Sequence, residues 1–457
     1  LNYPPSMAGF QPKRKFDETG KIILGSGLLG ITVLYLMADK LIPQPFEPFA
    51  FRASFRLYTG IVAMMAMSAC MILAARPAFL QNYLNGLDKS YRLHKWLGIT
   101  ALVAAMLHFW VANVIKWGSE WGWYPRPPKS SPAPGNALET WLYSLKDAAE
   151  NVGEWMFYLS AALMIVALVK WIPYRWFVKY HKWLAVAYLA LVFHAIVLMK
   201  FTFWTQPISW VSSIFMLCGS IAAIWILMGK TGKSRQFDGT IKNIIPLPNS
   251  QAVQLNIHIP KWQGHQAGQF AFLHHEHSNE KPHPFTLSSA WRQNGEVSML
   301  IKNLGDYTAH IAEHFHIGDT VRLEGAYGTF TMNDAAPVQI WIAGGIGITP
   351  FLAKLEALAH TSANHQTIYL FYSYQTADDA LLTQIRQAAK QAQVNLYLHD
   401  STQKGHLSSA DIIHPISHWQ QASVWFCGNK KFATTIKQGL RQQGWHGIFH
   451  QEQFEMR

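Results

Sequence analysis

The sequence predicts a multi-domain membrane protein in which a six-helix transmembrane bundle is followed by an antiparallel β-barrel and a Rossmann-like α/β domain. Nearly continuous apolar segments fill residues 20–228 of the 457-residue chain, and 50% of all residues are apolar while only 14% are charged. After residue 236 the pattern changes to short runs of alternating polarity, and then to a strand, a glycine turn and a helix. One part of the chain is therefore expected in a membrane and the other in water.

Six apolar stretches are long enough to cross about 30 Å of hydrocarbon as helices. We expect them near residues 20–41, 57–75, 91–115, 151–172, 174–199 and 208–228. Basic residues gather before the first stretch and after the second, fourth and sixth, so the positive-inside rule places residues 1–19 and both termini in the cytoplasm and the 116–150 loop outside. We expect a multi-pass protein of the plasma (inner) membrane without a cleaved signal, because the first apolar run is too long for one. The net charge of +12 then reflects topology and contact with anionic lipid, and no nucleic-acid partner is expected.

Four histidines lie inside these apolar stretches, and they form two matched pairs. The tetrapeptide His-Lys-Trp-Leu occurs twice, in "YRLHKWLG" and "VKYHKWLA"; His94 is followed by His108, and His181 by His194. An unsatisfied polar group in hydrocarbon costs several kcal/mol, so each imidazole needs a partner. A lone histidine would be read as hydrogen-bonded to a neighbouring helix, whereas two matched pairs favour metal ligation. The other histidines all lie at or beyond residue 258, where surface placement is the default interpretation.

The spacing of these histidines suggests how they are used. Fourteen residues at about 100° each bring His108 to within about 40° of His94, on one helix face and about 21 Å further along. Two such helices would offer two opposed pairs, His94 with His181 near the cytoplasm and His108 with His194 near the outside. Haem iron accepts two axial imidazoles, so two b-type haems are expected. Thirteen residues place His194 about 140° from His181, so we expect a π-bulge or another irregularity in that span.

The remainder of the chain is expected to form two further domains after a linker at 229–236. Residues 237–335 carry short alternating runs such as "SQAVQLNIHI", separated by Gly, Pro and Asn turns, as in a small antiparallel barrel. Residues 336–457 begin with "VQIWIAGGIGITPFLAKLEAL", the strand, glycine turn and helix of a Rossmann-like unit. The three cysteines are far apart, which excludes a disulfide framework and a CxxC metal site.

The glycine turn could serve a nucleotide. Gly344, Gly345 and Gly347 would let backbone amides approach a pyrophosphate, and Pro350 suits the first turn of the following helix. Glycine turns also serve simple tight packing, so this motif alone leaves both uses open.

Taken together, the chain resembles the ferric reductase and NADPH oxidase superfamily, of the prokaryotic type, over nearly its whole length. The resemblance rests on the paired histidines and on "HPFTLSS", "GGIGITP", "VWFCGN" and the terminal "FHQEQFEMR", in that order along one chain. It implies a ferric-reductase-like membrane domain at 20–228, an FAD-binding barrel and an NAD(P)H-binding α/β domain.

The resemblance also implies roles for individual residues. For FAD it implies His283, Pro284, Phe285, Thr286, Lys302, Gly305 and Thr308. For the nicotinamide nucleotide it implies Gly344, Gly345, Gly347, Thr349, Pro350 and Gly428. Thr286, Cys427 and Phe454 would lie at the reacting rings, with Phe285 on one flavin face and Phe454 covering the other. Gln375 and His406 stand where family members that prefer NADPH often carry arginine, so the preference between NADH and NADPH stays open.

The implied activity is the transfer of electrons from cytoplasmic NAD(P)H through FAD and two haems to an acceptor outside the membrane. Ferric iron is the acceptor we expect, and reduction of oxygen to superoxide is the alternative. Ala112 stands where the oxidases tend to have a histidine, whereas Arg56 resembles an arginine that they share. A transporter with proton-relaying histidines is a remote alternative, which leaves the flavin motifs without a task.

Overall fold

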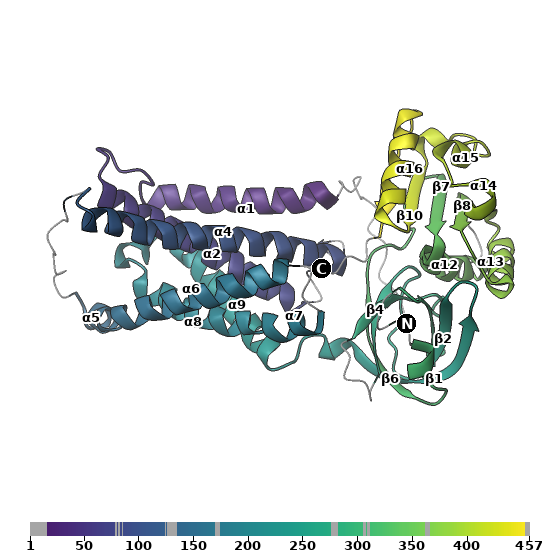
Figure 1. Cartoon of the computed structure of the whole chain (residues 1–457), viewed down its shortest axis with the longest axis horizontal. Helices are drawn as coiled ribbons and strands as arrows, with labels where there is room; N and C mark the ends of the chain where they lie inside the picture. The colour runs from purple at the N-terminus through teal and green to yellow at the C-terminus, as the bar shows by residue number, and fades with distance from the viewer. Residues whose placement is uncertain are drawn as a thin grey trace. The chain divides into compact units, whose positions relative to one another are not determined.

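The computed structural model divides the chain into two compact units, the first ending at Thr231 and the second spanning Gly232–Met456 (Figure 1). The structure describes residues 16–77, 80, 83–84, 86–123, 125, 135–169, 174–275, 282–304, 308, 311–361 and 366–452. The N-terminal segment before residue 16 lies outside these ranges.

The first unit is a helical bundle. Within the described residues, six helical segments are long and apolar enough to cross a membrane, which confirms the predicted number of spans. They are α1 (Phe16–Ala38), α2 (Pro48–Ala74), α4 (Leu87–Glu120), α6 (Lys146–Leu168), α7 (Tyr174–His181) continued by α8 (Trp183–Leu198), and α9 (Pro207–Leu227). Helix α2 packs along both α4 and α9, and α6 packs along α8.

Two predicted boundaries in this bundle were wrong. Helix α2 begins at Pro48 rather than near residue 57, because Arg52 is accommodated inside the bundle: its guanidinium Nε and Nη2 donate to the Ala112 carbonyl at 2.9 and 2.8 Å. The predicted 116–150 loop is shorter than expected, since α4 runs to Glu120 and a separate helix, α5 (Ala137–Ser144), precedes α6. Residues 124 and 126–134 of that loop lie outside the described ranges.

The predicted irregularity in the fifth span is present as a helix break. Helix α7 ends at His181 and α8 begins at Trp183, with Lys182 between them. The Ala185 N–H donates to the Lys182 carbonyl at 3.0 Å, an i→i+3 bond that tightens the chain locally. The break falls between His181 and His194, in the segment where the thirteen-residue spacing predicts an irregularity.

The second unit begins with an antiparallel barrel. Its strands are β1 (Gln236–Leu247), β2 (Ala252–His258), β3 (Phe270–His275), β4 (His283–Thr286), β5 (Glu296–Lys302) and β6 (Thr320–Tyr327), in the order β4-β3-β6-β1-β2-β5. A bridge between Leu287 and Met299 links the end of β4 to β5 and closes the sheet. Alternate residues of β2 enter the core, among them Val253 and Leu255, and a short helix, α11 (Ile311–His314), precedes β6.

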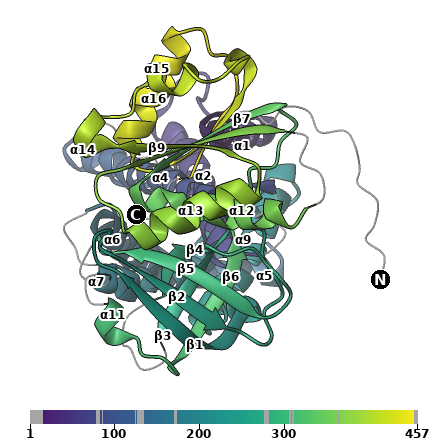
Figure 2. The same ribbon diagram turned by 90° about the vertical axis from the view of Figure 1, so that its right-hand side faces the viewer.

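A parallel five-stranded sheet completes this unit, with helices on both faces (Figure 2). The sheet consists of β7 (Val338–Gly344), β8 (Thr367–Tyr374), β9 (Asn395–Asp400), β10 (Ser423–Cys427) and β11 (Phe449–Gln451), in the order β11-β10-β7-β8-β9. Trp341 of β7 packs with α12 (Thr349–Ala359) and α13 (Asp379–Gln391), whereas Ile340 packs with α15 (Ser409–Ile413) and α16 (Lys430–Gln442). A single turn, α14 (Ser401–Lys404), follows β9. The predicted fold class is confirmed.

Candidate redox site

The structure brings the four membrane histidines together as the two predicted pairs. The ring centres of His94 and His181 lie 6.0 Å apart, with 66° between the ring planes. Those of His108 and His194 lie 6.3 Å apart, with 75° between the planes. The first pair joins the N-terminal part of α4 to the end of α7, and the second joins α4 to α8.

Backbone carbonyls of neighbouring helices fix the orientation of three of these rings. His94 Nδ1 lies 3.1 Å from the Cys70 carbonyl oxygen, and His108 Nδ1 lies 2.8 Å from that of Arg56, both on α2. His194 Nδ1 lies 2.7 Å from the Ala149 carbonyl oxygen on α6. A carbonyl accepts only, so each Nδ1 carries the proton and Nε2 is left with a lone pair for a metal.

The two ring separations are those that shared axial ligation would give. Two imidazoles bound to one metal at about 2 Å each, from opposite sides, place their ring centres about 6 Å apart. Both observed separations agree with this value. The apolar walls of the bundle, which include Met64, Met67 and Leu184, would suit a porphyrin. The residues present therefore fit two haems.

Two glycines that the sequence interpretation missed make room for the second pair of rings. A Cβ on Gly153 of α6 would lie 2.1 Å from His194 Nδ1, a distance that no real side chain tolerates. A Cβ on Gly60 of α2 would lie 3.1 Å from His108 Nδ1. A glycine inside an apolar helix is a signal of close approach by a neighbour, and this signal was available in the sequence for both positions.

Two arginines of α2 also lie near this pair. Arg56, whose carbonyl receives the His108 bond, and Arg52 occupy successive turns of α2, and Arg52 binds the Ala112 carbonyl one turn beyond His108. The two residues that divide the oxidase and reductase interpretations, Arg56 and Ala112, are thus both beside the His108–His194 pair.

The proposed flavin residues lie on adjoining strands of the barrel. His283, Pro284, Phe285 and Thr286 form β4, which pairs with β3 so that Thr286 faces Phe270. Lys302 ends β5, the strand joined to β4 across the barrel closure, and the Thr308 hydroxyl accepts from the Leu304 N–H at 2.9 Å. Phe285 is half-buried and packs against the barrel core, as ordinary packing would also predict. Gly305 lies outside the described residues.

The glycine loop lies against the end of β10. Gly344 ends β7, Gly345 adopts a left-handed φ of +55° in the turn η3 (Gly345–Ile348), and Thr349 and Pro350 begin α12. A Cβ on Gly347 would lie 2.1 Å from the Cys427 carbonyl oxygen. Gly347 is therefore required by close packing of the two strand ends, and this packing also brings the loop beside Cys427 and Gly428.

The thiol at this junction is buried and protonated. Burial raises the pKa of Cys427 well above its ordinary value, and Glu452 raises it further. A neutral thiol packs as a small apolar group, and Cys427 lies beside the glycine loop in this form. The chain continues from β11 to Glu452, and Phe454 lies outside the described residues.

Comparison with known families assigns each part of the chain. Residues 59–192 match the ferric reductase like transmembrane component, residues 239–347 match an FAD-binding domain, and residues 341–438 match the oxidoreductase NAD-binding domain. His94, His108 and His181 fall in the first match, which ends two residues before His194. Strand β4 falls in the second match, and the glycine loop and Cys427 fall in the third.

Individual relatives extend over different parts of the chain. The ferric/cupric reductase transmembrane component 2 of Saccharomyces cerevisiae is 24% identical over 413 residues, covering 86% of this chain and 52% of its own length. The electron transfer component of toluate 1,2-dioxygenase from Pseudomonas putida is 26% identical over 194 residues, 38% of this chain and 56% of its own. The chain thus spans about half the length of these relatives. Among solved structures, the flavohem-like FAD/NAD-binding domain of nitric oxide dioxygenase from Vibrio cholerae covers 47% of this chain and 98% of its own, at 18% identity and a TM-score of 0.41.

The fold and the three matches define a multi-pass membrane oxidoreductase with a flavin and nicotinamide module. The chain thus combines a ferric reductase like transmembrane component with FAD-binding and oxidoreductase NAD-binding domains, and it is similar over most of its length to the yeast ferric/cupric reductase component. These matches favour an oxidoreductase over the nucleotide-sensing transporter.

Proposed function

We propose that this protein carries electrons across the plasma membrane, from NAD(P)H in the cytoplasm to ferric iron, held as a chelate, on the outside. The observation that carries the proposal is the pair of histidine pairs, one above the other in a bundle continuous in sequence with FAD- and NAD-binding domains. A single pair could serve as a structural contact, whereas two stacked pairs provide two electron-carrier sites along the membrane normal.

His94 with His181 would hold the inner haem, and His108 with His194 the outer one. When bound, flavin accepts two electrons as a hydride and passes them on singly, and each haem iron carries one. The carbonyls of Cys70, Arg56 and Ala149 orient three of the rings and keep the proton on Nδ1. The chain contributes placement and potential, so no acid-base dyad is required.

In the soluble unit, residues of β4 would hold the flavin. Phe285 would stack on the isoalloxazine, Thr286 would bond at its reactive edge, and His283 with Pro284 would position the ribitol or phosphates. Lys302, Gly305 and Thr308 would contact the cofactor from the next strand and its loop. The glycine loop, from Gly344 through Pro350, and Gly428 would bind the nicotinamide nucleotide, with Phe454 displaced from the flavin when the nicotinamide binds.

The topology follows from charge. Basic residues flank the cytoplasmic ends of the spans, and the 116–150 segment would face outward. NAD(P)H would therefore act on the side of the His94–His181 pair, and the external acceptor on the side of the His108–His194 pair. Oxygen is the competing acceptor, and the position of Arg56 beside the second pair is the observation that favours it.

Sealed vesicles test both the route and the acceptor. The vesicles are oriented with the cytoplasmic side facing the lumen, and NADH or NADPH is enclosed in the lumen. We expect reduction of an impermeant ferric chelate outside the vesicles, and little superoxide. The His108→Ala protein should lose this activity, whereas His446→Ala, an exposed histidine of the soluble unit, should retain it. If superoxide is the main external product, oxygen rather than ferric iron is the acceptor. If activity requires NAD(P)H outside the vesicles, the proposed membrane topology is wrong.

A further inference from the structure

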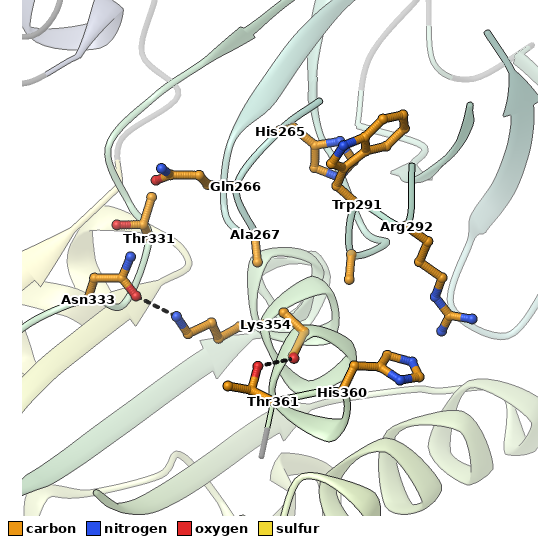
Figure 3. Close-up of a pocket in the computed structure, with 12 residues that line it drawn as sticks. His265, Gln266, Ala267, Trp291, Arg292, Thr331, Asn333, Lys354, His360 and Thr361 are labelled. Carbon is orange, nitrogen blue, oxygen red and sulfur yellow. Dashed lines mark hydrogen bonds between the residues drawn. The ribbon is translucent and has the colours of Figure 1, made fainter. Parts of the chain in front are cut away.

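A cavity in the soluble unit lies between the barrel and the α/β domain (Figure 3). Its volume is about 720 Å³, within the range of small-molecule sites. Its walls come from the segment before β3, the segment after β4, the segment before β7 and one side of α12. None of the twelve lining residues is among those assigned above to flavin or nicotinamide.

Cationic side chains line this cavity. Lys354 on α12 and Arg292 after β4 carry fixed charges, His360 stands at the edge, and no carboxylate is among the twelve lining residues. Two carboxylates lie just outside the lining. Glu356 accepts from the Ala290 N–H at 3.1 Å and lies 3.7 Å from Arg292 Nη2, and Asp334 adjoins Lys354.

Lys354 is partly buried and aimed at the cavity. Its Nζ donates to the Asn333 side-chain oxygen at 2.6 Å (Figure 3). Burial lowers the pKa of Lys354, and Asp334 opposes that shift. An ammonium carries three protons, so one hydrogen bond to the Asn333 amide leaves Lys354 two further protons with which it can donate to a ligand. An anion entering the cavity would therefore find a charged donor already held in place.

An aromatic wall faces the same cavity. The Trp291 ring lies 6.0 Å from that of His265, and both residues line the cavity (Figure 3). His265 is fixed on both sides, since its Nδ1 accepts from Trp262 Nε1 at 3.1 Å and its Nε2 donates to the Ser289 carbonyl at 2.8 Å. This pattern requires a neutral imidazole, in agreement with burial lowering the pKa of His265.

The close approach of Trp291 also depends on a glycine. Gly264 has a φ of +105°, and a Cβ there would lie 2.8 Å from the Trp291 indole nitrogen. The indole is thus seated by its surroundings, and it is an aromatic group of the kind on which nucleobases stack.

We propose that this cavity binds a nucleoside monophosphate at a site separate from the redox nucleotide, with its base against Trp291 and its phosphate at Lys354. The ring, the cationic donor and the neighbouring amide match the two chemical halves of such a ligand. The proposal requires nothing of the electron route across the membrane.

Equilibrium dialysis of labelled AMP against the full-length, FAD-loaded protein in detergent tests this site. Saturating NAD⁺ and NADP⁺ are present to fill the dinucleotide site. We expect Lys354→Gln and Trp291→Ala each to weaken AMP binding by about tenfold or more. Lys390→Gln, a matched change on the neighbouring helix α13, should leave the affinity unchanged. FAD content reports whether each variant is folded, and Arg292→Gln, on a half-exposed side chain, replaces Lys354→Gln if that protein loses FAD.

Three results would overturn the proposal. One is the absence of AMP binding once NAD⁺ and NADP⁺ are present, and another is undiminished binding by the Lys354 and Trp291 variants. The third is equal affinity for inorganic phosphate and AMP, which would show that the nucleobase contributes nothing to binding.

Discussion

The two helices that carry the histidines solve one geometric problem in different ways. Helix α4 is uninterrupted from Leu87 to Glu120 and spaces its histidines by fourteen residues. The partner span spaces them by thirteen and is broken at Lys182, immediately after His181. Nevertheless the ring separations of the two pairs differ by only 0.3 Å, from 6.0 to 6.3 Å.

The comparison shows that the two histidine pairs have similar ring separations although only one of the two spans is an uninterrupted helix. Fourteen residues return nearly to the same face of a regular helix, so α4 needs no distortion. Thirteen residues do not, and the partner span is interrupted at Lys182, between its two histidines.

Removing single histidines should have the largest effect. His94→Ala or His181→Ala should remove the inner haem, and His108→Ala or His194→Ala the outer, so that each variant keeps one haem of two. Haem per chain and the reduced spectrum of purified protein measure this. His446→Ala serves as the control, and retention of two haems by any of the four variants would refute that residue as a ligand.

One-residue insertions should separate the two helices. An alanine inserted after Gly98 rotates His108 by about 100° relative to His94, so the outer haem should be lost. An alanine inserted after Lys182 gives the partner span the fourteen-residue spacing of α4, so a regular helix could restore the pairing and most of the outer haem should remain. Haem content again provides the measurement. Equal loss from both insertions would show that the break at Lys182 has no compensating role.

Methyl groups beside the outer rings should have the smallest effects, in a defined order. Gly153→Ala places a Cβ 2.1 Å from His194 Nδ1. It should weaken retention of the outer haem by about tenfold, the smaller of the losses in affinity seen when a residue that supports a metal ligand is mutated. Gly60→Ala, with its 3.1 Å approach to His108 Nδ1, should have a smaller effect.

Gly98→Ala on α4 is the matched control for these methyl groups, since nothing lies within 4 Å of its Cβ position. Alanine favours a helix over glycine by about 1 kcal/mol, so helix propensity cannot explain a loss of haem. Haem-transfer kinetics to apomyoglobin should rank Gly153→Ala above Gly60→Ala above Gly98→Ala, and any other order would contradict the contacts.

Much of this arrangement was predictable from the sequence, because it depends on periodicity. The apolar stretches located six spans, and the spacings of fourteen and thirteen predicted both pairs of facing histidines and an irregular fifth span. The start of α2 was not predictable, since Arg52 reads as a residue outside the membrane until its bond to Ala112 on another helix is known.

The supporting contacts of the site were equally hidden. The carbonyl acceptors from Cys70, Arg56 and Ala149 belong to the backbone, and no residue type announces them. Gly153 carried a signal, but its meaning depends on the tertiary neighbour that fills the space. In the soluble unit, sequence motifs located β4 and the glycine loop, whereas the contact of Gly347 with Cys427 required the folded sheet.

The number and spin state of the haems in the purified wild-type protein test the paired ligation most directly. Two b-type haems per chain, both low-spin by electron paramagnetic resonance in the oxidised protein, are the predicted result, because each iron would have two imidazole ligands. Fewer than two haems, or a stoichiometric high-spin signal from an iron with an open axial position, would contradict pairing of His94 with His181 and of His108 with His194.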